Sequence, residues 1–129
     1  LATLRAMEAA DSWTVITETG LRVIELWRAC AARHGLELTT QGLPALASFT
    51  IPGPKFLAYK TLITQEMLKD GILASNIMYS CTEHTDASLD RYHTSLDRVF
   101  GLIAECEMGR RIEDLLEGPV CQSGFARLN

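Results

Sequence analysis

The stretch that decides the fold reads Thr64-Gln-Glu-Met-Leu-Lys-Asp-Gly-Ile-Leu-Ala-Ser-Asn-Ile-Met-Tyr-Ser-Cys-Thr-Glu-His-Thr-Asp-Ala-Ser-Leu-Asp-Arg-Tyr92. Apolar residues at helical spacing precede Gly71, and glycine readily adopts the positive φ that closes a helix. Segments 72–74 and 77–81 are too short for helices and carry residues that suit strands. Thr85 is then a good N-cap for a new helix. The stretch therefore predicts a helix, two short strands and a second helix.

Hydrophobic periodicity outside this stretch predicts the other helices. Apolar residues three or four apart indicate helices over 12–34, 56–69 and 86–107, and residues 1–10 also read as helical. Gly20 lies inside the first long helix, where glycine costs about 1 kcal/mol relative to alanine. We therefore expect another segment of backbone to approach Gly20 closely.

Alternating residues predict strands at 36–41 and 45–51, joined by a Gly-Leu-Pro turn that favours an antiparallel pair. With the short strands at 72–74 and 77–81, they predict an α+β fold. This fold is a small, mainly antiparallel sheet of three to four strands with helices packed on one face. At 129 residues the chain has room for one domain.

The order of these elements resembles the C-terminal small domain of class III, fold-type-I aminotransferases that use pyridoxal phosphate (PLP). The nearest likeness is to glutamate-1-semialdehyde aminomutase and its aminotransferase relatives. The family pattern, Gly-Ile/Val and later Ala-His-Thr-acidic-acidic-Asp-Ile, is matched by Gly71-Ile72 and by the run from Glu83 to Asp90. The likeness continues upstream through Asp11-Ser12-Trp13, Gly20 and Gly35-Leu36. The chain departs from the pattern at Glu83, Ala87 and Ser88, and at Asn76, where the family has a glutamate.

The resemblance implies that residues 1–108 are an aminotransferase small domain and that 109–129 form a C-terminal tail. Because the chain begins at Leu1 inside a helical run, we read it as a piece of a longer enzyme. The cofactor-anchoring lysine would then lie in a missing large domain, PLP would belong to the full-length parent, and none would bind this fragment. We expect no catalytic residue here and no activity from the fragment alone.

The same resemblance places Ser75 and Asn76 at the substrate, because the small domain of the family closes the mouth of the site. A carboxamide at 76 carries no charge, so we expect a different or relaxed specificity from that of the family. The expected substrate is a small amino-acid or amino-sugar-like molecule. The expected partners are the large domain and a second copy of the chain in a homodimer.

The tail at 109–129 has two interpretations of equal weight. It either lies on its own domain, or packs on the large domain or a second subunit through Phe125 and Leu128. Residues 110–117 could form a short amphipathic helix. We also expect apolar surface on the N-terminal stub and on the tail, and therefore self-association or a tail folded over the stub. The residues concerned are Leu1, Leu4, Met7, Val120, Phe125 and Leu128.

Composition argues against several classes of partner. The net charge of -4 and the pI of about 5.3 argue against nucleic acid and anionic membranes. There is no apolar run of roughly 18 residues and no signal-peptide pattern, so we expect a cytoplasmic protein without a membrane partner.

Individual polar residues receive structural interpretations. We expect Cys30, Cys81 and Cys106 to be buried, reduced thiols, and His84 to bond nearby backbone rather than act in catalysis. Cys81, His84 and His93 lack zinc-finger spacing, so we expect no metal site. Lys55 reads as a solvated loop residue. Trp13 and Trp27, about four helical turns apart, read as core or interface residues.

Two other functions stay open. The chain could be a stand-alone α+β ligand-binding or regulatory module, since small sheets of this kind host many binding sites. It could also be a purely structural dimerisation piece.

Overall fold

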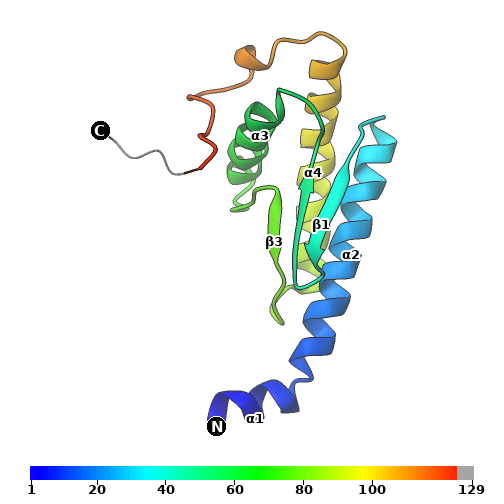
Figure 1. Ribbon diagram of the computed structural model, residues 1–129, viewed down its shortest axis with the longest axis vertical. Coiled ribbons are helices and arrows are strands. Elements are labelled where there is room, and N and C mark those ends of the chain that lie inside the picture. Colours follow the sequence, from blue (N-terminus) through cyan, green and yellow to red (C-terminus); the bar gives the residue numbers. More distant parts are fainter. Residues whose placement is uncertain (125–129) are drawn as a thin grey trace, which may run out of the picture.

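The computed structural model describes residues 1–124 and has the predicted α+β fold, with helices on one face of a small sheet (Figure 1). The predicted helix boundaries agree with the structure to within one residue, and the helical run at the N-terminus is confirmed. In chain order the elements are α1 (Ala2–Ala9), α2 (Ser12–Arg33), β1 (Thr39–Leu43), β2 (Leu46–Thr50), α3 (Phe56–Lys69), β3 (Ile77–Tyr79), α4 (Asp86–Glu107) and the short 3-10 helix η1 (Ile112–Asp114).

The sheet has three antiparallel strands in the order β1-β2-β3. β1 and β2 form a hairpin whose last pair is Leu43 with Leu46, so the turn is Pro44-Ala45 rather than the predicted Gly-Leu-Pro. The prediction of a strand at 72–74 is wrong, because this segment is an extended connection outside the sheet. Strand-forming residues there have no neighbouring strand to pair with. β3 pairs with β2 over three residues only.

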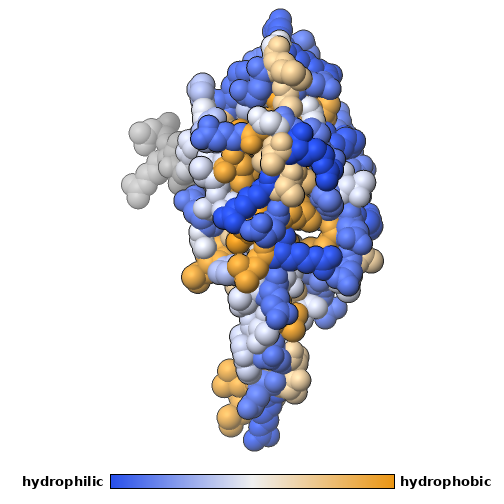
Figure 2. Space-filling view, turned by 90° about the vertical axis from the view of Figure 1, so that its right-hand side faces the viewer, coloured by the Kyte–Doolittle hydropathy of each residue, from blue (hydrophilic) through white to orange (hydrophobic). Residues whose placement is uncertain are grey.

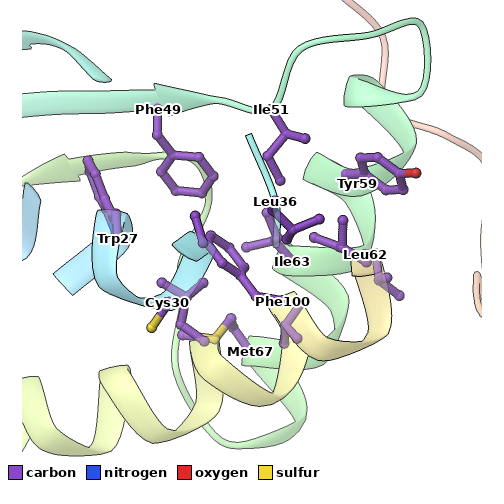
Figure 3. Close-up of a cluster of buried hydrophobic side chains, with 14 of the residues drawn as sticks. Trp27, Cys30, Leu36, Phe49, Ile51, Tyr59, Leu62, Ile63, Met67 and Phe100 are labelled. Atoms are coloured by element: carbon purple, nitrogen blue, oxygen red, sulfur yellow. The ribbon is translucent and has the colours of Figure 1, made fainter. Parts of the chain in front are cut away.

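The core lies between the sheet and the helices (Figure 3). Phe49 on β2 is fully buried, with its ring centroid 4.9 Å from that of Trp27 on α2 and 5.7 Å from that of Phe100 on α4. Both contacts are edge-on, an arrangement that aromatic pairs favour. Trp27 is therefore a core residue as predicted, whereas Trp13 is half exposed. These two edge-on contacts tie both long helices to the middle strand.

The contacts of α4 show the direction in which each neighbouring helix runs. Along α2, Arg22 pairs with Asp86, and His34 pairs with Asp97 further on, so α2 and α4 run parallel. Lys55 at the start of α3 reaches Cys106 at the end of α4, so α3 and α4 run antiparallel. This arrangement brings residues of α2 and α4 together at a nearly constant offset along the sequence.

The N-terminal helix α1 projects away from this body and buries no residue (Figure 1). The chain bends at Asp11, whose φ is 44°. Leu4 and Met7 on α1 and Leu1 just before it are exposed, and Figure 2 shows hydrophobic residues on this protruding end. In the described part of the chain, no helix is long and apolar enough to cross a membrane.

The segment after α4 lies along α3. Gln65 donates to the carbonyl oxygen of Leu115 and accepts from the Glu117 amide, both over 2.8 to 2.9 Å. The Cys121 amide donates to Thr61 Oγ1 over 2.9 Å. Only one turn of 3-10 helix forms where an amphipathic helix was considered. The anchors Phe125 and Leu128 lie outside the described residues.

Candidate functional site

A pocket of about 320 Å³ opens between the segment 71–78, which includes the start of β3, and the start of α4. Two residues that mark helix ends, Gly71 and Thr85, position its walls. Gly71, with φ of 74°, ends α3 and turns the chain into the connection. Thr85 begins α4, and its Oγ1 accepts from the Ser88 amide. The apolar side chains of Ile72, Ala74, Met78 and Leu89 contribute much of the lining.

His84 stands at the rim of this pocket and has the structural role that the sequence predicts. Its Nδ1 accepts a hydrogen bond of 3.0 Å from the Cys81 amide. Arg91, also a lining residue, donates to the Asp70 carbonyl oxygen over 3.1 Å and so fixes the end of α3. These polar groups hold backbone in place. In the described part of the pocket they form no acid–base pair.

Asn76 links the connection to the sheet. Its buried side chain donates from Nδ2 to the Phe49 carbonyl oxygen over 3.0 Å, and the Phe49 amide donates to the Asn76 carbonyl oxygen. Ser75 Oγ lies 3.2 Å from Asn76 Oδ1. Asn76 thus extends the pairing with β2 by one residue ahead of the start of β3. In the sequence, the polar Asn76 just before the apolar strand residue Ile77 was the only sign of this bridge. The contact of Ser75 and Asn76 with substrate stays a prediction.

Neither Lys55 nor Lys69 has the desolvated setting that imine chemistry requires. Lys55 is half exposed and binds the Cys106 carbonyl oxygen over 3.2 Å, so it caps α4 as well as meeting solvent. Lys69 pairs with Glu66 and Glu117, both at 2.7 Å. These residues do not fit covalent attachment of PLP.

An ion-pair network that the sequence analysis missed joins α3 to α4. Arg98 donates to Glu66 over 3.0 Å and to Asp70 over 2.9 Å. Burial alone would raise the pKa of Glu66, but hydrogen bonds from Lys69, Gln65 and Arg98 outweigh it and lower that pKa to about 2. The network holds the two helices together, and its Asp70 adjoins the pocket through Gly71 and Arg91.

The cysteines follow the prediction in part. Cys30 and Cys106 are buried and free, but Cys81 is exposed because β3 ends before it and leaves it in a loop. The ligand atoms of Cys81, His84 and His93 do not form a group within reach of one metal ion in the described part of the chain. Among the described residues, the group whose ligand atoms come within metal-binding reach of one another is Cys30, His93 and Asp97.

No protein-family model matches the chain, and no curated protein sequence matches it. A solved structure does share its fold: the FumI protein of Sphingopyxis sp. MTA144, determined as its PLP internal aldimine. The TM-score is 0.73 at 19% sequence identity. The similarity covers 88% of this chain but only 28% of the FumI chain. The chain therefore has the fold of one part of a larger protein of known structure.

Proposed function

We propose that this chain is the C-terminal small domain of a PLP-dependent enzyme of the class III, glutamate-1-semialdehyde aminomutase type. In this proposal it closes the substrate site of a large domain. The observation that carries the proposal is that nearly the whole chain superposes on about a quarter of a PLP-containing structure. The order of the motif from Gly71 to Asp90 supports the class III assignment.

The surfaces that the fold leaves open support a partner domain. The sheet face opposite the helices exposes Leu43, Leu46, Ile77 and Tyr79. Neighbouring apolar residues on a sheet face are more telling than scattered ones, because contiguous exposed patches tend to mark interaction sites. The large domain would cover this face. Helix α1 would pack on the large domain or on a second subunit.

The cofactor would reside in the large domain, because Lys55 and Lys69 are held by hydrogen bonds and ion pairs within this chain. When bound there, PLP supplies the electron sink of the reaction. This chain would contribute the segment 71–78 beside the substrate. Ser75 would contact a small amino-acid or amino-sugar-like substrate, and the buried Asn76 would hold the segment in place. The bond from Asn76 to Phe49 keeps that segment rigid against the core.

The test begins with the reading frame upstream of Leu1. The proposal expects it to encode a domain with a PLP-binding lysine, and the full-length product to carry bound PLP and transaminate amino donors. Ser75→Ala is then expected to raise KM several-fold for the best substrate. Thr94→Ala, on the exposed side of α4, is the matched control and leaves KM unchanged. A frame with no such domain would overturn the proposal.

The second candidate is a stand-alone ligand-binding module, favoured by the pocket of about 320 Å³ with its apolar lining from Ile72, Met78 and Leu89. The two functions differ in one measurement. A module binds a small molecule with the 129-residue chain alone, and Leu89→Trp, which fills the pocket, abolishes that binding. A small domain shows no such binding.

A further inference from the structure

Two facing turns of α2 and α4 bring together four side chains with metal-binding groups. Cys30 and His34 are four residues apart on α2, and His93 and Asp97 are four apart on α4. Residues at i and i+4 share a helix face, and the two helices run parallel. Each pair therefore projects toward the other helix. Figure 3 shows the Cys30 sulfur at the edge of the core, between the ribbons of α2 and α4.

The distances within this cluster suit a small cation. The ligand atoms of Cys30, His93 and Asp97 all lie within 4.8 Å of one another. Around Zn²⁺, ligand atoms lie about 2.0 to 2.3 Å from the ion, hence about 3.3 to 3.8 Å apart in a tetrahedral set. Closing the cluster from the largest of these separations requires shifts of about 1 Å.

His93 gives an independent sign that a ligand is missing. Its Nε2 is buried and has no hydrogen-bond partner in the described structure. A buried polar atom without a partner costs about 1 to 3 kcal/mol, and native proteins retain few of them. Binding a cation at Nε2 would remove this cost.

Asp97 is already held in position from the other side. His34 Nε2 lies 3.1 Å from Asp97 Oδ1, and Arg33 lies 2.9 Å from Oδ2. Second-layer hydrogen bonds of this kind orient ligands in protein metal sites. The Arg33 side chain is half exposed and can swing into solvent when a cation arrives.

We propose that Cys30, His93 and Asp97 form a Zn²⁺ site between α2 and α4, with water as the fourth ligand and His34 positioning Asp97. Thiolate, imidazole and carboxylate are the groups that zinc takes in proteins. One thiolate and one carboxylate balance the two charges of the ion. The site would cross-link the two long helices, and it does not depend on the function proposed above.

Proton release accompanies binding at such a site. Burial, followed by the nearby Asp97 charge, raises the pKa of the Cys30 thiol to about 11. The metal-free thiol therefore keeps its proton at neutral pH, and the metal has to displace it.

The experiment uses the reduced, metal-free 129-residue chain titrated with Co²⁺ and then Zn²⁺. One equivalent of Co²⁺ is expected to give a thiolate-to-cobalt charge-transfer band with the visible bands of tetrahedral cobalt, and Zn²⁺ should abolish them. Cys30→Ser, His93→Gln and Asp97→Asn should each weaken binding more than tenfold. His34→Gln should weaken it less. Cys81→Ser, which removes an exposed thiol, is the matched control and leaves the spectrum unchanged.

Each outcome of the titration either supports or contradicts the zinc site. Because Cys30 is buried, folding of each variant is first checked by circular dichroism. His93→Gln and Asp97→Asn alter half-buried positions and keep the test open if Cys30→Ser unfolds. The proposal is wrong if the native chain binds no metal at micromolar concentration. It is also wrong if folded His93→Gln and Asp97→Asn keep the full cobalt band, or if Cys81→Ser removes it.

Discussion

Gly20 lies directly against the backbone of Pro44, since a Cβ on Gly20 would stand 1.8 Å from the Pro44 carbonyl oxygen. The turn of the β1–β2 hairpin thereby docks on α2 at the one position without a side chain. This contact offsets the weak helix propensity of glycine, as the sequence predicts. It also sets where the hairpin crosses the helix and hence where Phe49 enters the core.

Gly20→Ala should lower the free energy of unfolding by about 1 to 3 kcal/mol, because the added methyl displaces the Pro44 carbonyl. Helix propensity alone would give the opposite sign, a gain of about 1 kcal/mol. Gly101→Ala on α4 is the matched control, since its Cβ would meet His34 no closer than 3.4 Å. That variant should be neutral or more stable. Urea unfolding of the two variants gives the comparison, and a stabilised Gly20→Ala would contradict the close approach.

The long helices could be predicted from sequence because of their apolar periodicity and because local signals mark several of their ends. Gly35 and Gly71 adopt positive φ at helix ends, and the Thr85 side chain caps α4. These are local effects of one or a few residues. Effects of this kind can be read from a short stretch of sequence without knowledge of the fold.

Several of the errors concern pairing between distant segments. Residues 72–74 have strand-like composition, yet the sheet offers them no partner. Whether Cys81 is buried depends on where β3 stops, and that depends on the length of β2. The bridge from Asn76 to Phe49 spans 27 residues, and the cluster of Cys30 with His93 and Asp97 spans more than 60. The periodicity of one segment gives no information about its contacts with a distant segment.

Tyr92→Phe should destabilise the chain by about 1 to 3 kcal/mol. The Trp27 Nε1–H donates to the Tyr92 hydroxyl over 2.7 Å within the core, and removing that hydroxyl leaves the indole N–H buried without an acceptor. Tyr79→Phe, on the exposed sheet face, is the control and should change stability by less than about 0.5 kcal/mol. Equal effects of the two substitutions in urea unfolding would rule out a contribution from the buried bond.

Glu66 should make the chain sensitive to acid. The pKa of its carboxyl is about 2 in the folded chain against 4.5 ordinarily, since hydrogen bonds to Lys69, Gln65 and Arg98 outweigh the opposing effect of burial. A lowered folded pKa gives stability that is present above pH 4.5 and lost as the pH falls toward 2. The contribution is on the order of 2 to 3 kcal/mol at neutral pH.

Unfolding free energies measured between pH 7 and pH 3 test this contribution. Glu66→Gln should be less stable at pH 7 and should lose less stability on acidification than the native chain. Some slope remains, because interactions with Arg98 and Ser95, against the opposing effect of desolvation, also lower the pKa of Asp70. Glu113→Gln, which removes an exposed and loosely paired carboxylate, should follow the native curve. Parallel curves for the native chain and Glu66→Gln would refute the assignment.

The exposed apolar surface should make the chain self-associate at micromolar concentration. Leu4 and Met7 on α1 have exposed fractions of 64% and 41%, and α1 packs none of its residues into the core. Burying apolar area contributes about 25 cal/mol per Å², and a symmetric dimer is the commonest closed arrangement. The variant Leu4→Glu/Met7→Glu should therefore shift sedimentation toward the monomer. Arg5→Gln, a polar change on the same helix, should leave the association unchanged. A native chain that sediments as a monomer throughout, or a double variant that associates as strongly as the native chain, would show that α1 does not drive assembly.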